Sequence, residues 1–507
     1  MGSSFLLGID VGGTAVKVAL FQVTGELLAL EEVAIPVQSP KSGWAEIDPE
    51  HWLEAITEGV HSVLDTPKAF ADGVVAIGLS NMIGTVTPLD ASGLPLRPAI
   101  AYFDTRSARE ASWILGKVPN IEEITGNRVV SGNTSLTSML WIREHEPEVY
   151  ETTTLFAQVG TLLFRWLTGQ TYVDWTNASF TGLYDYRTKD WHPKIADALD
   201  IDLDLLPPIA APDTTFPLLR QRAEALGLRS GTPVVLGGID GAMASVGVGA
   251  IHPGDVFDVS GTSEMVAACL PAPSICPELL GRWHVVPHIW VLIGAMSTSG
   301  AALRWFGREM FGRADEDPDQ TLYQEMTAAA SSSPPGANGV IFLPHMMGER
   351  APLWDPHARG VFFGLSLSTA RGDMVRAVME GTAFAMRHLL ELIENQSGIS
   401  LNRVVTVGGA ARNALWRQIK ADVWGMDVVT LKVGEATALG AAMTAGVGAG
   451  IYEDYHEAVQ RTLSAVDEVV SPDASRHRAY EEPYQVYRTL YPALADSMHL
   501  AATGEKR

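Results

Sequence analysis

The sequence predicts an α/β fold made of two domains with a cleft between them. Three observations lead to this prediction: the chain is too long for one hydrophobic core, strands and helices alternate within it, and its opening pattern recurs near the middle. The chain has 507 residues, whereas single cores rarely grow beyond about 250–300 residues. We place the boundary near residue 250, which gives domains of residues 1–250 and 251–507.

The first domain opens with short strands joined by glycine turns. Its predicted strands, which are apolar and rich in β-forming side chains, are residues 5–9, 16–21, 27–35 and 74–79. Gly12-Gly13 form the first turn, and apolar residues at helical spacing predict a helix over 51–64. Residues 104–230 are less regular and are predicted to be mostly helical. A further strand at 234–236 leads through two glycines into Asp240 and a helix of small residues.

The second domain restarts this pattern after residue 254. Its predicted strands are residues 256–259, 265–270, 404–407 and 428–433. Two helices are predicted over 413–424 and 436–449, the second of them rich in alanine and glycine. Mixed strands and helices in each half are typical of an α/β class.

Composition excludes several classes of function. The formal net charge of −23 argues against a nucleic-acid or anionic-membrane surface, which would need a basic face. Two cysteines, Cys269 and Cys276, cannot build a disulfide framework and fit a reducing compartment. The apolar run at 5–9 is too short for a signal peptide, and no stretch is long enough to span a bilayer. We therefore expect a cytoplasmic protein.

The first candidate for chemistry is the turn Asp10-Val11-Gly12-Gly13-Thr14. Glycine has no Cβ, so its backbone N–H can approach a phosphate closely. The Asp10 carboxylate beside that turn suits a hydrated Mg²⁺, which prefers oxygen ligands. The alternative is a glycine-rich hairpin with a surface aspartate.

The same logic recurs in the second half at Gly261-Thr262-Ser263, which follows Asp258 on a strand. Two such turns, each opening one half of the chain, could grip a phosphate chain from two sides. Between them, Asp240 ends a strand and begins a helix, where ligands meet α/β sheets. It could accept a proton from a hydroxyl, or it could simply cap its helix.

The fourth candidate is the strand-to-helix turn that begins at Gly408-Gly409 and reaches Asn413. Its glycines could let adenine and ribose lie against the backbone, or they could serve only a tight turn. Rival motifs are missing: the sequence has no G-x-x-x-x-G-K-[ST] phosphate loop and no G-x-S-x-G nucleophile turn.

These motifs resemble the FGGY family of carbohydrate kinases, in the superfamily of sugar kinases, Hsp70 and actin. The most specific match is Gly360-Val361-Phe362-Phe363-Gly364-Leu365, followed by Asp373-Met374 and Ala377-Val378-Met379-Glu380. The segments at 348–352 and 355–359 resemble the xylulokinase branch.

The resemblance implies two actin-like (ribonuclease H-like) domains, the first binding sugar and the second binding ATP with Mg²⁺. It implies Asp240 as the catalytic base and Asp10 at the metal. The residues implied at the nucleotide are Gly12, Gly13, Thr14, Lys17, Gly261, Thr262, Ser263, Gly408, Gly409 and Asn413. It also suggests a homodimer, and it places a connection between the domains at 435–441.

The sugar side departs from the family pattern. Pentulose kinases of this type carry Gln-Met-His-Gly where this chain has Asn81-Met82-Ile83-Gly84, so Ile83 replaces a histidine. We expect Asn81, Met82, Ile83 and Asp104 to line the sugar site, with an ion pair to Arg106 as the alternative for Asp104. Candidate aromatic platforms are Trp44, Trp175 and Trp354.

We therefore expect a kinase that transfers phosphate from ATP to a small sugar, with a pentulose such as D-xylulose first. Other acceptors remain open, including gluconate, ribulose and a glycerol-like polyol. Two further alternatives are a non-catalytic sugar or nucleotide sensor on the same fold, and an actin- or Hsp70-like ATPase that acts on proteins.

Overall fold

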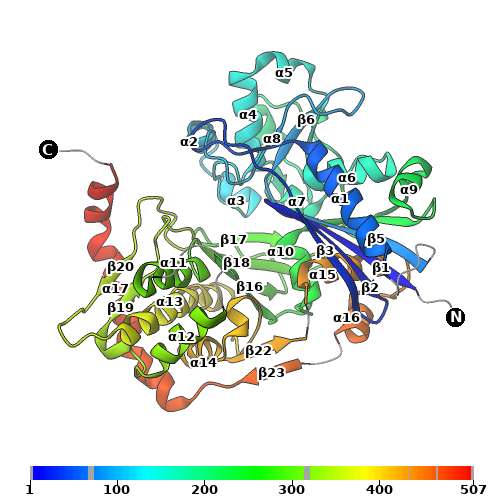
Figure 1. The fold of residues 1–507 in the computed structure, drawn as a ribbon. Helices are drawn as coiled ribbons and strands as arrows, with labels where there is room; N and C mark the ends of the chain where they lie inside the picture. Colours follow the sequence, from blue (N-terminus) through cyan, green and yellow to red (C-terminus); the bar gives the residue numbers. More distant parts are fainter. Residues whose placement is uncertain (1–3, 67–72, 313–319, 433, 464–465, 504–507) are drawn as a thin grey trace.

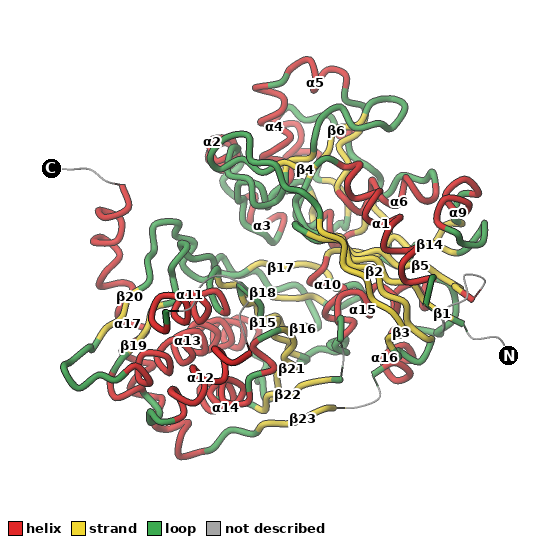
Figure 2. Tube along the Cα trace, viewed as in Figure 1, coloured by secondary structure: helices red, strands yellow, loops and turns green. Residues whose placement is uncertain are grey.

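The chain folds into two bodies, each built on one large sheet (Figure 1). The computed structural model describes residues 4–66, 73–312, 320–432, 434–463 and 466–503. Figure 2 shows the strands of the two sheets in yellow and the helices packed around them in red.

The first sheet has the strand order β13-β14-β5-β1-β2-β3. Its strands are β1 (Phe5–Val11), β2 (Ala15–Gln22), β3 (Leu27–Ala34), β5 (Val74–Asn81), β13 (Thr215–Pro217) and β14 (Pro233–Ile239). The strands β1, β2 and β3 pair antiparallel, whereas β5 is parallel to both β1 and β14. The predicted opening meander is thereby confirmed.

The second sheet has the order β17-β18-β16-β15-β21-β22-β23. Its strands are β15 (Val256–Ser260), β16 (Glu264–Leu270), β17 (Leu280–Trp283), β18 (Trp290–Met296), β21 (Arg403–Gly408), β22 (Asp427–Leu431) and β23 (Val466–Val470). Three antiparallel strands are again followed by two parallel ones. The predicted recurrence is confirmed, although Val433, in the predicted strand 428–433, lies outside the described residues.

A smaller sheet and several helices extend the first body. Its strands are β4 (Glu46–Ile47), β7 (Ala99–Ile100), β6 (Val86–Leu89) and β8 (Leu155–Gln158). The helices are α2 (Ala108–Lys117), α3 (Ile121–Thr125), α4 (Ser135–His145), α5 (Pro147–Thr152), α6 (Val159–Thr168), α7 (Trp175–Ala178), α8 (Pro193–Leu199) and α9 (Arg220–Leu226).

The region 104–230 also holds short strands that the sequence did not predict. Besides β8 and β13, they are β9 (Val173–Asp174), β10 (Tyr184–Asp185), β11 (Asp190–Trp191) and β12 (Ile209–Ala210). Each has only two to four residues, too few for alternation of apolar and polar residues to show.

The second body carries most of the later helices. They are α11 (Gly300–Phe311), α12 (Gln320–Ser331), α13 (Arg371–Ser397), α14 (Ala414–Trp424) and α17 (Ala474–Thr503). A two-stranded sheet of β19 (Ile341–Leu343) and β20 (Val361–Phe363) lies beside α13. None of the helices in the described parts of the chain combines the length and apolar character that a membrane crossing requires.

Helices cover both faces of the first sheet. On one face, α1 (Pro49–Leu64) packs Trp52 and Ile56 against alternate residues of β1 such as Leu7. On the other face, Leu6 packs with α10 (Asp240–Gly247), α15 (Ala436–Gly448) and α16 (Tyr455–Thr462). Burial on both faces explains why β1 is an almost continuous apolar run.

Helix α15 comes from the second half of the sequence but lies against the strands of the first sheet, where Figure 1 draws it in orange beside blue. The approach is very close. A Cβ on Gly440 of α15 would lie 1.8 Å from the backbone oxygen of Met243 on α10, and a Cβ on Gly8 of β1 would lie 2.1 Å from that of Ala438. Only glycine allows such contacts, so the small residues of α15 set the position of α10.

We expect Gly440→Ala to destabilise the protein by about 3 kcal/mol or more, because a methyl group cannot fit against a backbone oxygen without moving a helix. The thermal unfolding midpoint measures this effect. The control is Gly116→Ala in α2, where a Cβ would meet nothing within 4 Å. Equal midpoints for the two variants would contradict the close packing described here.

Candidate active site

The carboxyl ends of three parallel strands bring Asp10, Ser80 and Asp240 to one edge of the first sheet. Asp10 pairs in register with Ser80 on β5, and Asp240 follows β14 directly as the first residue of α10. The Ser80 hydroxyl donates a hydrogen bond of 2.7 Å to Oδ1 of Asp10. Two carboxylates therefore share this edge, where α/β sheets bind ligands.

The two carboxylates raise the cost of ionisation at this edge. Burial, and next the charge of Asp240, raise the pKa of Asp10 to about 7, while the Ser80 bond and Lys17 oppose that rise. Burial also raises the pKa of Asp240, opposed by the 2.6 Å bond from the Gly241 N–H and by the charge of Arg282. The Asp240 side chain still reaches solvent, so water can hydrate its ionised form.

This pair of acids fits a Mg²⁺ ion that also binds phosphate oxygens. Mg²⁺ usually takes only one or two carboxylates and keeps several waters. Among the described residues, no group of three or more His, Cys, Asp or Glu side chains gathers as a complete metal site. Asp10 is therefore suited to bind a hydrated, phosphate-bound cation, and Asp240 is suited to accept a proton.

The first glycine turn lies against an aromatic pair. A Cβ on Gly13 would lie 3.2 Å from the ring of Phe103 and 3.6 Å from that of Tyr102. Burial and then the charge of Asp240 raise the pKa of Tyr102. The segment that starts at Tyr102 therefore borders both the first turn and Asp240.

The second glycine turn reaches the same place from the other body. A Cβ on Gly241, next to Asp240, would lie 3.6 Å from the terminal methyl of Met265, which follows the turn Gly261-Thr262-Ser263 on β16. The three turn residues are exposed. Behind them, the N–H of Gly300 donates to the Gly261 oxygen at 3.0 Å, at the start of α11. Residues that adjoin the two turns, Tyr102 and Met265, thus approach the start of α10.

The turn after β21 adjoins the second glycine turn. Gly408 pairs with Ser260 in register, has a φ of 98°, and has no room for a Cβ, which would lie 2.3 Å from the Ser260 oxygen. Space around Gly409 is open. Asn413 caps α14 by accepting from the Trp416 N–H at 3.1 Å and donates to Thr327 on α12 at 2.7 Å. The structure thus gives Asn413 a turn-and-cap role, and its contact with a nucleotide stays a prediction.

Lys17 lies across from Asp10 on β2. Its ammonium is 3.0 Å from Oε2 of Glu435, the residue before α15, and 4.0 Å from Glu32. Burial lowers the pKa of Lys17, but Glu435, Glu32 and Asp10 together outweigh burial and raise it overall. The cation is therefore held beside the first turn by a partner from the second half of the chain.

Two of the residues predicted on the sugar side are engaged within the protein. Asn81 donates to Asn177 at 3.0 Å and is fully buried, as is Asp104. The Asp104 carboxylate accepts from the Ala45 N–H at 2.6 Å and from the guanidinium of Arg106 at 2.7 Å. This geometry favours the ion pair, in buried form, over direct contact between Asp104 and a sugar. Met82 is buried and Ile83 is half-buried.

The three candidate tryptophans also have partners. Trp44 lies under the Arg106 guanidinium, 3.7 Å from its ring centre. Trp175 donates to the His284 oxygen at 2.8 Å, and Trp354 donates to the Glu278 oxygen at 2.9 Å.

Sequence reasoning missed three residues that adjoin the site: Ser80, Arg282 and Arg350. The charge of Arg282 lowers the pKa of Asp240, and that of Arg350 lowers the pKa of Tyr102. Both arginines belong to the second body, so no local pattern signals that they approach Asp240.

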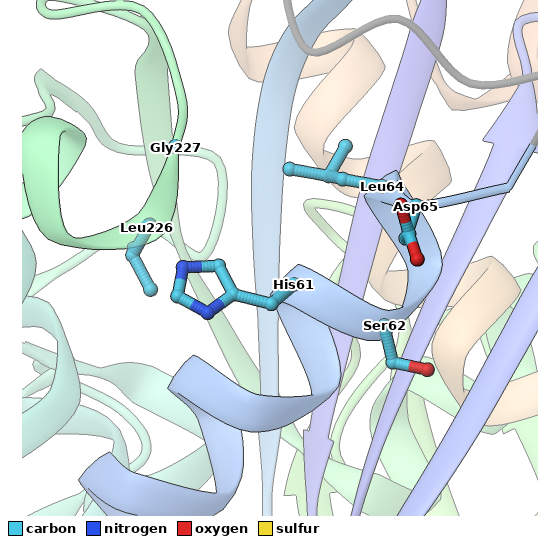
Figure 3. Close-up of a pocket in the computed structure, with 6 residues that line it drawn as sticks. All are labelled: His61, Ser62, Leu64, Asp65, Leu226 and Gly227. Atoms are coloured by element: carbon cyan, nitrogen blue, oxygen red, sulfur yellow. The ribbon is translucent and has the colours of Figure 1, made fainter.

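A hollow of about 480 Å³ between α1 and α9 lies elsewhere (Figure 3). None of the candidate site residues named above lines this hollow.

Two matching sheets with acidic groups and glycine turns between them define a phosphotransferase of the actin-like type. Family models agree: the N-terminal domain of the FGGY family of carbohydrate kinases matches residues 5–247, and the C-terminal domain matches residues 258–449. The chain belongs to the FGGY family of carbohydrate kinases.

Individual relatives extend over the whole chain. The xylulose kinase of Escherichia coli (strain K12) is 32% identical over 97% of this chain and 99% of its own. Among solved structures, a gluconate kinase from Lactobacillus acidophilus matches with a TM-score of 0.91, 27% identity and coverage of 98% and 99%. A ligand-bound xylulose kinase from the same organism matches with a TM-score of 0.90 at the same identity and coverage. The predictions of the family and of the two-domain fold are confirmed.

We expect Asp10→Asn to raise the thermal midpoint in metal-free buffer at pH 8 by about 2–4 °C. The folded protein retains the Asp10 proton up to about pH 7, whereas the unfolded chain releases it near pH 3.8. Wild-type stability is therefore lost as pH rises through this window, and asparagine avoids that loss.

At pH 4 the difference between Asp10→Asn and wild type should shrink, because pH 4 lies at the lower end of this window, where the unfolded chain has released the proton only in part. Glu58→Gln, which removes an exposed charge on α1, controls for net charge. A gain that is as large at pH 4 as at pH 8 would contradict the raised pKa.

Proposed function

We propose that the protein transfers the γ-phosphate of ATP to a hydroxyl of a small sugar, with Asp240 as general base. The observation that carries this proposal is that residues adjoining both glycine turns approach the start of α10, where Asp240 shares one edge of the sheet with Asp10. Each half of the chain supplies one turn, so a phosphate chain bound between them would meet an acceptor at Asp240.

Each residue has a role that follows from its position. Asp240 takes the proton of the attacking hydroxyl, and its access to solvent keeps the carboxylate available for that task. The backbone N–H groups of Gly12, Gly13, Thr14 and of the turn 261–263 would hold phosphate oxygens, which is the positioning and charge stabilisation that phosphoryl transfer requires. Asp10 would hold Mg²⁺, which neutralises charge on the phosphates when bound.

Lys17 adds a mobile positive charge beside the first turn. Its ion pair with Glu435 is only partly buried, and such pairs contribute little to stability. A phosphate could therefore compete with Glu435 for the ammonium at low cost. We place the adenosine between the turn that starts at Gly408 and α12, where Gly409 has open space around it.

The acceptor is proposed to be a pentulose such as D-xylulose, because xylulose kinases match the chain from end to end. Gluconate is the second candidate, since a gluconate kinase matches equally well. Ile83 does not decide between these two acceptors. It replaces a histidine and so removes one polar contact from the sugar side, and it leaves the phosphate side unchanged.

An ADP-release assay identifies the acceptor. The panel is D-xylulose, D-ribulose, gluconate and glycerol, each with ATP and Mg²⁺. We expect D-xylulose to give a kcat/KM at least about tenfold above the others, which corresponds to 1.4 kcal/mol of discrimination. Preference for gluconate would replace the pentulose, and no stimulation by any acceptor would overturn the kinase proposal in favour of a sensor.

Asp240→Asn is expected to lower kcat by about 10²–10⁴-fold with the best acceptor, because the base that accepts the proton is lost. Binding of ADP, measured by calorimetry, should remain within about twofold. Asp454→Asn changes an exposed acid at the start of α16 and should keep near-wild-type kcat. Near-wild-type turnover of Asp240→Asn would disprove the role of Asp240.

A further inference from the structure

A buried cluster of charged residues lies directly beneath the second glycine turn. Lys420 on α14, Asp258 on β15 and Glu264 on β16 are each at most 1% exposed. The Lys420 ammonium is 2.7 Å from Oδ2 of Asp258 and 2.8 Å from Oε1 of Glu264. One cation therefore joins two strands and a helix at the base of the hairpin.

The cluster holds both stems of the turn. Ser260 and Glu264 are the last cross-strand pair before Gly261-Thr262-Ser263. The Lys420 ammonium donates to the Ser260 hydroxyl, which itself donates to Asp258 at 2.7 Å. On the other stem, the Glu264 carboxylate forms an ion pair with the Lys420 ammonium. Lys420 thus reaches the residue before the turn and the residue after it.

The same cluster extends to the segments on either side of the turn. Glu264 accepts from the hydroxyl of Ser299, which precedes α11, and the backbone of α11 donates to the turn. Asp258 accepts from the hydroxyl of Thr406 at 2.6 Å. Thr406 lies on β21, which ends at Gly408, and Lys420 lies on the helix that begins after Asn413. The second glycine turn and the strand that leads to the Gly408 turn are therefore both tied to one ammonium.

Charge balance makes this arrangement depend on Lys420. Burial lowers the pKa of Lys420, but the two carboxylates outweigh burial and raise it overall, so the ammonium stays charged. Burial raises the pKa of Glu264 to about 7 despite the opposing charge of Lys420. Removing the cation would leave two buried acids side by side, and they would separate or take up protons.

Asp258 and Asp10 both precede a glycine turn, but the surroundings of the two carboxylates differ. Asp10 is partly exposed, whereas Asp258 is fully buried and paired. Asp258 therefore cannot bind a metal ion together with a bound phosphate, and the second turn has a buried support where the first has a candidate metal ligand.

We propose that Lys420 is a positioning residue for the nucleotide: through Asp258 and Glu264 it fixes the second glycine turn relative to the Gly408 turn, and so it sets the affinity for ATP and ADP without touching them. This inference rests on the proposed function, because that function assigns the two turns to the nucleotide. It goes further by naming the group that holds them in register.

The test is Lys420→Met, which keeps the length of the side chain and removes the charge. We expect the KM for ATP and the dissociation constant of ADP, measured by calorimetry, to rise about tenfold to a hundredfold, since small displacements of a positioning group have effects of this size. The KM for the sugar should stay within about twofold. If Lys420→Met caused only a packing defect, it would change the stability of the protein, and the ratio of the KM for ATP to the KM for the sugar would stay the same.

The matched control is Arg376→Met, which breaks another buried ion pair in the same body, 2.6 Å from Glu380, with partners Ser333 and Tyr480. It should lower the thermal midpoint and leave the KM for ATP unchanged. Equal increases of this KM in both variants, or no increase in Lys420→Met, would overturn the inference.

If Lys420→Met fails to fold, Ser299→Ala and Thr406→Val each remove one hydrogen bond of the cluster and keep its charges. Each should weaken ADP binding several-fold, and unchanged affinity in both would overturn the inference. Wild-type protein is measured first. If the wild type shows sugar-stimulated turnover and the variants bind ADP with unaltered affinity, the result would count against the role of Lys420 alone. If the wild type does not bind ADP, the result would count against both proposals.

Discussion

Helix α15 packs so tightly against the first sheet and against α10 that a single methyl group at Gly440 has no room. This packing is the constraint on which the site depends. Asp240 is the first residue of α10, so the position of α10 sets where its carboxylate lies relative to Asp10 on β1, two strands away from β14. Because α15 lies between β22 and β23 of the second sheet in sequence, the same contact also joins the two halves of the chain at the candidate active site.

The two halves of the chain have similar glycine turns, but the residues that support the two turns differ. The turn at Gly12-Gly13 lies beside Asp10 and Lys17, which are only partly buried. The turn at Gly261 stands on the buried cluster around Lys420. A phosphate chain bound between the two turns would therefore contact the candidate metal ligand Asp10 on one side. On the other side it would contact a turn whose geometry is fixed by the buried cluster around Lys420.

Much of this could be predicted from the sequence. The opening strands are marked by apolar runs and glycine turns, and the recurrence of the pattern at 256–270 signalled the duplicated sheet. Asp10 and Asp240 could be found because each ends a strand next to glycine. The fit of the chain to a known family added the fold and the reaction class.

Other features depend on contacts between distant residues and had no local signal. Lys420 and Asp258 are far apart in sequence, and a lysine in an amphipathic helix is usually exposed. The burial of Asp104 against Arg106 and Ala45 was equally hidden, so a plausible sugar ligand proved to be held inside the protein. The short strands between β8 and β13 were missed because two or three residues show no period.

The most direct test is a crystal structure with a non-hydrolysable ATP analogue, Mg²⁺ and the acceptor selected by the assay. The account predicts the acceptor hydroxyl within hydrogen-bond distance of Asp240, with the triphosphate between the turns 12–14 and 261–263. A nucleotide bound away from either turn, or an acceptor hydroxyl out of reach of Asp240, would contradict it.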